Sequence, residues 1–225
     1  MSERKQQFRA LRSALGHALG QAGADQAGFQ LASLTVREIE KRAATRLRLL
    51  PGDTGSLAKS RDLPLATGTC SGKDPAVLCL RPGEWLVVSQ SMAPDELLGH
   101  VRARHDAAGF FCWDHSEALA LIRIEGEAAP WLLRKHCGLD IPLNRPAEAL
   151  CAQTLFARIS VLMHCYVNGP AGNELAGVFD LYVDRSRATY LWNLLVNSAA
   201  HADQLYERYG AAKSAPVGAR DPARS

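Results

Sequence analysis

The chain has 225 residues, of which 47% are hydrophobic and 22% charged, close to the average of soluble globular proteins. This composition excludes wholesale disorder, and the length suits one large or two small domains with a sizeable core. The formal net charge of +3 is too small to indicate a nucleic-acid partner. No apolar run approaches the roughly 20 residues that span a bilayer, so we do not expect a membrane protein.

The N-terminal residues predict an amphipathic helix. Phe8, Leu11 and Leu15 fall on one helical stripe with Ala18 or Leu19, and basic residues lie around it. Such a helix could be an organelle presequence, lie on a membrane surface, or pack on this protein or a partner subunit. The narrow stripe favours packing. We therefore assign residues 1–28 to this helix and a linker.

The next residues predict a single α+β domain over residues 29–209. Strands are expected at residues 31–36, 43–50, 77–80, 85–88, 110–113 and 118–124, and helices near 95–106, 127–136 and 185–200. This β-β-α rhythm divides the domain into halves of about 29–108 and 109–209. It predicts mostly antiparallel sheets with helices on their outer faces. Residues 210–225 are rich in Ala, Gly, Pro, Arg and Ser and predict a flexible tail.

The stretch from residue 151 to residue 199 predicts a strand, a turn, a strand and a helix. Val161, Met163 and Cys165 alternate with a more polar set, as in a half-buried strand, and residues 177–184 repeat the alternation. The final segment spaces its apolar residues as one helix face does. A unit of this kind buries its sheet face by laying the helix across it.

Four motifs resemble one protein family. They are Cys151-Ala-Gln-Thr-Leu, Phe179-Asp-Leu-Tyr-Val-Asp-Arg-Ser, Leu80-Arg-Pro-Gly-Glu-Trp-Leu-Val-Val and Arg134-Lys-His-Cys-Gly-Leu-Asp. In this order, across roughly residues 30–200, they resemble the gamma subunit of heterotetrameric sarcosine oxidase. The resemblance implies the fold of the folate-binding aminomethyltransferases.

The resemblance also implies a function within a complex. The family's enzyme demethylates sarcosine oxidatively to glycine, with hydrogen peroxide and 5,10-methylenetetrahydrofolate or formaldehyde. The resemblance implies FAD and FMN in the beta subunit, NAD and the tetrahydrofolate site in the alpha subunit, and zinc in the delta subunit. The gamma subunit holds no cofactor and packs on alpha. A departure at residues 113–118, where His115 is inserted in a turn, leaves open a related N-methyl amino acid as substrate.

Six cysteines form no Cys-x-x-Cys pair, and the N-terminus lacks the apolar stretch of a signal peptide. We therefore expect reduced, mostly buried thiols and a cytoplasmic location. Cys137 is the strongest candidate nucleophile, because three basic residues precede it. Its place at a helix C-terminus disfavours a thiolate, so a packing role is preferred.

Metal and anion sites are not predicted. His100 and His105 are five residues apart, and the neighbours His164 and Cys165 point to opposite faces of a strand. The adjacent pair His136-Cys137 and the glycine loops at residues 52–55 and 68–72 also lack the pattern of a site. Hence no catalytic, cofactor-binding or metal-binding residue is expected in the chain.

Several polar and aromatic residues are expected to hold the fold. Asp184 or Ser186 would cap the final helix, while Asp180 would pair with Arg158 or Arg187 or stay solvated. Trp85 and Trp192 are core candidates first and interface anchors second.

Two other functions stay open. A free-standing folate-binding or aminomethyltransferase-like protein would need a pterin pocket with an acidic and an aromatic residue. An RNA-associated module of the same fold would need a basic face.

Overall fold

The computed structural model describes Leu15 and residues 28–40, 42–50, 62–105, 109–141, 150–167 and 177–209. The helix predicted within residues 1–28, apart from Leu15 and Gly28, and the tail at 210–225 lie outside the described residues. Leu15 itself is fully buried and belongs to the largest hydrophobic cluster.

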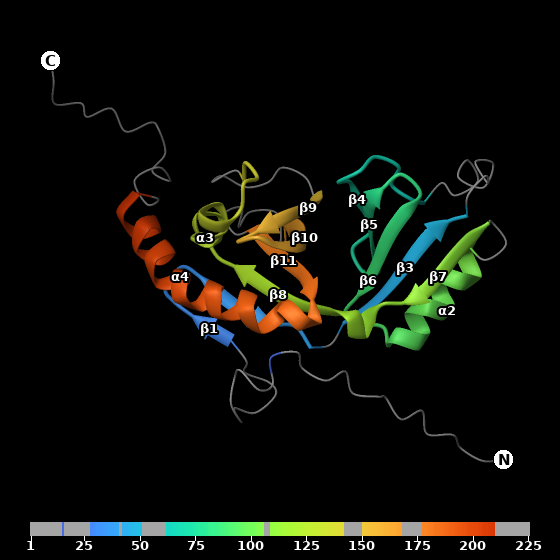
Figure 1. The fold of residues 1–225 in the computed structure, drawn as a ribbon, viewed down its shortest axis with the longest axis horizontal. Helices are drawn as coiled ribbons and strands as arrows, with labels where there is room; N and C mark the ends of the chain where they lie inside the picture. Colours follow the sequence, from blue (N-terminus) through green and yellow to red (C-terminus); the bar gives the residue numbers. More distant parts are fainter. Residues whose placement is uncertain are drawn as a thin grey trace, which may run out of the picture.

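Two antiparallel sheets form the centre of the molecule (Figure 1). Sheet A has the order β1-β2-β8-β11-β10-β9, with strands β1 (Gly28–Gln30), β2 (Thr35–Glu38), β8 (Leu119–Glu125), β11 (Gly177–Asp184), β10 (Ile159–Val167) and β9 (Leu150–Phe156). Sheet B has the order β4-β5-β6-β3-β7, with strands β4 (Cys70–Ser71), β5 (Ala76–Arg81), β6 (Glu84–Ser89), β3 (Ala43–Leu49) and β7 (Phe110–Asp114).

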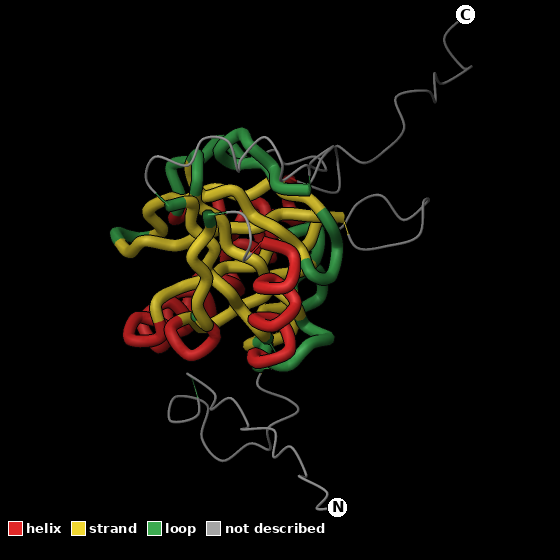
Figure 2. The backbone as a smooth tube through the Cα atoms, turned by 90° about the vertical axis from the view of Figure 1, so that its right-hand side faces the viewer, coloured by secondary structure: helices red, strands yellow, loops and turns green. Residues whose placement is uncertain are grey.

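Helices cover the outer face of each sheet, which produces four layers. Helices α3 (Ala129–His136) and α4 (Ala188–Tyr209) pack on sheet A, and α2 (Pro94–His105) packs on sheet B. Short 3-10 turns at Ser116–Ala118 and Arg185–Arg187 precede β8 and α4. The tube in Figure 2 shows the strands packed close together, with helices along the lower part of the molecule in that view. The predicted α+β class with mostly antiparallel sheets and outer helices is confirmed.

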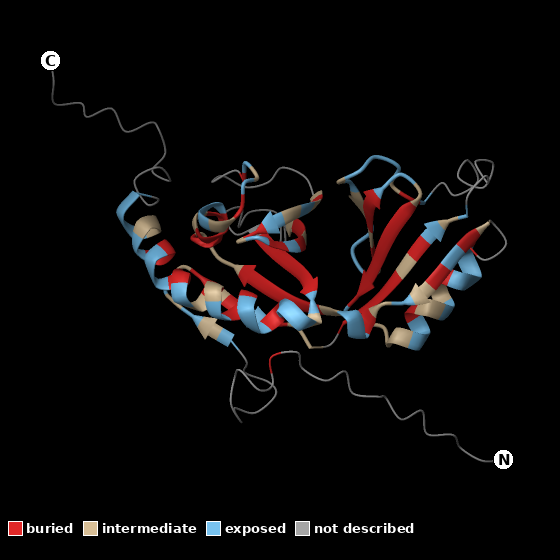
Figure 3. Cartoon of the chain, in the orientation of Figure 1, coloured by how far each residue is buried: buried red, intermediate tan, exposed pale blue. Residues whose placement is uncertain are grey.

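The period of two along the strands explains the three cores. In β10, Val161, Met163 and Cys165 face α3 and α4, whereas Leu162 lies on the opposite face, toward sheet B. A third cluster joins the sheets through residues from both, among them Leu86 and Tyr182. Figure 3 shows that the strands are largely buried and that the helices expose their outer faces.

The hairpin from β9 to β10 was not predicted as two strands. It turns at Ala157 and Arg158, whose φ angles are 46° and 74°. Such a tight turn normally carries Asn or Gly, so the sequence lacks the usual signal. The contacts that hold it come from distant residues, because the Ala157 amide donates to the His136 carbonyl at 2.9 Å.

The strand predicted at residues 31–36 is shorter in the structure and begins further along the chain, as β2 (Thr35–Glu38). Leu31 instead begins a turn, donating its amide to the Leu34 carbonyl. The Ser33 amide donates to Asp203 of α4 at 3.1 Å, which fixes the turn against the sheet's helical layer. Gly126 approaches this turn with a φ of 115°, and a Cβ there would overlap the Ser33 carbonyl.

The sheets divide the chain differently from the predicted halves 29–108 and 109–209. Strands β1 and β2 belong to sheet A, because β2 pairs with β8, while β7 belongs to sheet B, because it pairs with β3. Each predicted half therefore contains strands of both sheets. Within the described ranges, the helices are all too short or too polar to traverse a lipid bilayer.

Candidate functional site

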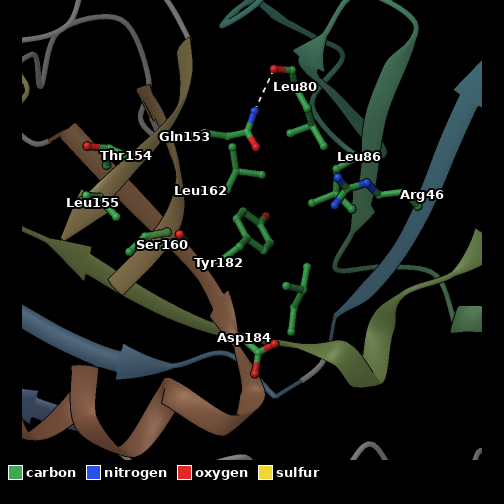
Figure 4. Close-up of a pocket in the computed structure, with 12 residues that line it drawn as sticks. Arg46, Leu80, Leu86, Gln153, Thr154, Leu155, Ser160, Leu162, Tyr182 and Asp184 are labelled. Atoms are coloured by element: carbon green, nitrogen blue, oxygen red, sulfur yellow. Dashed lines mark hydrogen bonds between the residues drawn. The ribbon is translucent and has the colours of Figure 1, made fainter. Parts of the chain in front are cut away.

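A cavity of about 490 Å³ lies between the two sheets (Figure 4). Sheet A contributes the starts of β8 and β10 and the ends of β9 and β11, and sheet B contributes β3, β5 and β6. Its lining consists of Arg46, Leu80, Leu86, Leu119, Gln153, Thr154, Leu155, Ser160, Val161, Leu162, Tyr182 and Asp184.

Apolar side chains from both sheets make most of the wall. Figure 4 shows Leu80 and Leu86 of sheet B opposite Leu162 and Tyr182 of sheet A. The Gln153 amide nitrogen bridges the sheets by donating to the Leu80 carbonyl at 2.8 Å. The cavity is therefore lined mainly by apolar side chains, with polar groups from Arg46, Gln153 and Tyr182 among them.

On the sheet B side of the cavity, Arg46 lines the wall and is held by Glu84. The Arg46 Nε donates to Glu84 Oε1 at 2.8 Å, and Arg81 donates to the second carboxylate oxygen. Burial alone would raise the pKa of Glu84, but the hydrogen bonds and charges of the two arginines lower it. Glu84 is consequently ionised and holds Arg46 in place at the rim.

His115, which the family resemblance predicts to be inserted in a turn, lies near Arg46 and Asp184. Its amide donates to the Ala44 carbonyl at 2.7 Å, which ties the turn after β7 to β3. Burial and the charge of Arg46 lower the pKa of the imidazole, while Asp114 and Asp184 oppose this shift. The neutral ring is thus favoured near neutral pH.

A second polar cluster occupies the other end of β10 and β11. Arg123 Nε donates to Asp180 Oδ1 at 2.7 Å and its Nη2 donates to Oδ2 at 2.8 Å, in a bidentate pair. Tyr166 donates to the same carboxylate at 3.1 Å. The prediction that Asp180 pairs with Arg158 or Arg187 was wrong, because Arg123 lies directly across from it in the antiparallel register.

This cluster is buried and internally satisfied. Arg123 is 6% exposed and Asp180 1%. Burial would lower the pKa of Arg123, but the hydrogen bonds and charge of Asp180 raise it, so the pair is ionised. Beside it, burial lowers the pKa of His164 to about 4, and Nδ1 has no hydrogen-bond partner among the described residues. Among the described residues, the arrangement holds the strands of sheet A together.

The cysteines occupy packing positions. Cys137 ends α3, and its sulfur contacts the Thr154 hydroxyl at 3.5 Å and accepts from the Leu139 amide at 3.4 Å. Burial raises the pKa of both Cys151 and Cys165 to about 12, with a smaller contribution from nearby thiols. Both thiols are therefore protonated and poorly nucleophilic.

The histidines considered as ligands are also separated. His164 faces sheet B and Cys165 faces the helices, as the strand alternation predicts. His136 bonds to the Ser198 hydroxyl at 2.8 Å, and His105 stacks edge-on against Phe110. The described part of the chain contains no group of three His, Cys, Asp or Glu residues placed to hold a metal ion.

The glycine loop at residues 68–72 joins the sheets. The Gly68 amide donates to the Cys79 carbonyl, and the Gly68 carbonyl accepts from the Cys151 amide at 2.9 Å. The loop at 52–55 lies outside the described residues. Asp184 caps the 3-10 turn that leads into α4 by accepting from the Ser186 amide at 2.8 Å, as predicted, and Trp85 and Trp192 are buried in the cores.

Together these features define a four-layer α+β protein with an apolar cavity between its sheets. Two curated relatives, both named sarcosine oxidase subunit gamma, match the sequence. The relative from Corynebacterium sp. (strain U-96) is 30% identical over 137 residues, which cover 58% of this chain and 66% of that protein. The relative from Corynebacterium sp. (strain P-1) is 31% identical over 143 residues, which cover 60% and 69%. The chain belongs to the family of sarcosine oxidase gamma subunits.

The fold agrees with a solved structure of that name. A chain of the heterotetrameric sarcosine oxidase from Corynebacterium sp. U-96, in complex with pyrrole 2-carboxylate, superposes with a TM-score of 0.65. The match covers 85% of this chain and 95% of that one, at 24% identity. No family model matches the sequence. The predicted resemblance to the gamma subunit is therefore confirmed.

Proposed function

We propose that the chain is the non-catalytic gamma subunit of a cytoplasmic heterotetrameric sarcosine oxidase and stabilises the complex by packing on the alpha subunit. The observation that carries this proposal is its membership of the gamma subunit family, supported by the shared fold. The assembled enzyme would oxidatively demethylate sarcosine, or a related N-methyl amino acid, to glycine. Hydrogen peroxide and 5,10-methylenetetrahydrofolate or formaldehyde would be the other products.

The polar groups of the described residues support a structural role for this chain within the enzyme. Arg123, Asp180 and Tyr166 satisfy one another, and the Cys151 and Cys165 thiols are buried and protonated. Reaction chemistry needs an activated group within reach of a substrate. As the family resemblance implies, we assign FAD and FMN to the beta subunit, NAD and tetrahydrofolate to the alpha subunit and zinc to the delta subunit.

Co-expression tests the proposal. The chain, tagged, is produced with the open reading frames that neighbour its gene, and the complex is isolated and examined for flavin absorbance and sarcosine-dependent peroxide formation. We expect a flavoprotein to co-elute with the chain in a fixed ratio. Isolation of the chain as a monomer with no flavoprotein would contradict the subunit assignment.

A second candidate, a free-standing folate-binding protein, is favoured by one observation only. The cavity between the sheets has a size typical of small-molecule sites, and Arg46 could meet a carboxylate at its rim. Isothermal titration of the purified chain with tetrahydrofolate distinguishes the two. The subunit proposal expects no stoichiometric binding. Tight binding that Arg46→Ala abolishes would favour the folate protein.

A further inference from the structure

Sheet A covers only part of the inner face of sheet B. Residues of β5 and β6, such as Leu78 and Leu86, are buried against Leu121 and Tyr182 of sheet A. The side chains at the far end of the same face belong to β3 and β7, and we call them the exposed strip. They are Arg46, Arg48, Phe111 and Trp113. Arg46 also borders the cavity, so the strip continues from its rim.

Strand pairing places these four side chains on one face. Arg46 is the partner of Trp113 in the register of β3 and β7, and Arg48 is the partner of Phe111. Leu47 and Cys112 alternate with them and are buried on the opposite face, in the cluster shared with α2. Because side chains alternate along these strands, burial of one face places the arginines and the aromatic rings on the opposite face.

The aromatic pair is unusual for a surface strand. Phe111 is 58% exposed, and its ring lies 5.3 Å from the Trp113 ring, centroid to centroid. Strand β7 is the terminal strand of sheet B among the described residues. Aromatic residues and arginine are the side chains most enriched in the parts of interfaces that dominate binding energy. Since the rings already contact each other, little side-chain entropy would be lost when a partner covers them.

The charge of this surface specifies the partner's chemistry. Glu84 accepts hydrogen bonds from both Arg46 and Arg81, so one carboxylate serves two cations. Arg48 is exposed and makes no ion pair with any residue in the described ranges. Arg48 thus places a positive charge beside the apolar patch, while Asp114 and Asp184 lie on the Arg46 side. This combination complements a segment carrying both carboxylates and apolar side chains.

We propose that the exposed strip docks an acidic segment of another subunit of the oxidase complex. Phe111 and Trp113 are its apolar anchors, and Arg48 receives a carboxylate of the partner. A sheet face that presents two neighbouring aromatic rings is better matched to a protein surface than to a small molecule, which binds in a concave site. The inference rests on the proposed function, because that function supplies the partner.

Two variants of the full chain test the docking surface in the assembled complex. Arg48→Glu reverses the charge at this position, and Phe111→Ser removes the exposed ring. Their matched controls are Arg102→Glu, an exposed arginine on α2, and Leu65→Ser, whose side chain is 56% exposed. Affinity for the other subunits is measured at low and high salt. We expect each strip variant to weaken binding about tenfold or more, and the controls to change it less than about twofold.

Hydrogen exchange supplies a readout that does not depend on a variant folding. In the wild-type complex, the amides of residues 110–114 should exchange more slowly than in the free chain, while those in the middle of α2 should not change. Unchanged exchange in β7 together with wild-type affinity of Arg48→Glu would overturn the docking proposal and leave the subunit assignment intact. The strip could instead join two copies of this chain. In that case the variants would lose a homodimer while their binding to the other subunits stayed unchanged, and this result would also overturn the docking proposal. Failure of the wild-type chain to join any complex would overturn the function itself.

Discussion

The two ends of the layer between the sheets carry similar chemistry in different settings. At one end, Arg123 and Asp180 form a bidentate pair that is almost completely buried. At the other, Arg46 pairs with Glu84 at the rim of an open cavity, and its side chain is 26% exposed. The buried pair is enclosed by sheet packing, so it serves the fold. The open pair borders an uncovered surface, so it is available to a partner.

Removing one partner of the buried pair should produce the largest effect. Asp180→Ala leaves the Arg123 charge buried without its carboxylate, which should lower the free energy of unfolding by about 3–5 kcal/mol. Denaturant titration measures the change. Asp62→Ala is the control, because Asp62 pairs with Arg104 in an exposed ion pair. A cost for Asp180→Ala no larger than that of the control would show that the two ends do not differ.

Leucines on opposite faces of sheet A should also differ in how much stability they contribute, with the enclosed face contributing more than the face that lines the cavity. Leu181 is fully buried against the helices, so Leu181→Ala should cost about 2–5 kcal/mol. Leu162 lines the cavity, and Leu162→Ala should cost roughly 1 kcal/mol because part of its surface already lacks packed neighbours. Thermal or denaturant unfolding of both variants checks the order. Equal losses would mean that the cavity wall is packed as tightly as the core.

His164 should make stability depend on pH. Its pKa falls from 6.5 to about 4 in the folded chain, because burial and the charge of Arg123 disfavour the imidazolium more than Asp180 favours it. Between these values the unfolded chain binds more protons, so this contribution is complete above pH 6.5 and is lost as the pH falls toward 4. The slope is at most about 1.4 kcal/mol per pH unit.

The difference between wild type and His164→Gln isolates this contribution, since other groups titrate in both proteins. We expect the variant to lose less stability than wild type between pH 6.5 and pH 4 in denaturant titrations. Parallel curves over that range would rule out a buried neutral His164.

Arg46→Met should have the smallest effect on stability, below about 1 kcal/mol, because Glu84 keeps its hydrogen bond from Arg81. If the open end serves a partner, this variant should weaken assembly more than it weakens the fold. Unfolding and subunit binding are therefore measured on the same preparation. A loss of stability equal to that of Asp180→Ala would show that the Arg46–Glu84 pair serves the fold as much as the buried pair does.

Local patterns predicted most elements because their signals lie within a few residues. The alternation in β3, β8 and β11 and the apolar stripe of α4 each identify the face that is buried. The Asp184 cap was predicted for the same reason, since its acceptor and the Ser186 amide are two residues apart. The predicted absence of catalytic, cofactor and metal residues in this chain stays a prediction.

Where prediction failed, the deciding contact joined residues far apart in sequence. Asp180 takes Arg123 as its partner because β8 and β11 pair in a specific register, which no local pattern determines. The hairpin at Ala157 lacks turn residues and is held by the carbonyl of His136. The missed cavity and exposed strip likewise depend on how far one sheet overlaps the other.

By itself the sequence determined the α+β class, the buried face of each main strand and the family, because periodicity and short motifs are local properties of the chain. Only the tertiary structure decided which charges are enclosed and which stay open. That outcome depends on strand order and on the overlap of the two sheets, which arise from long-range pairing and packing.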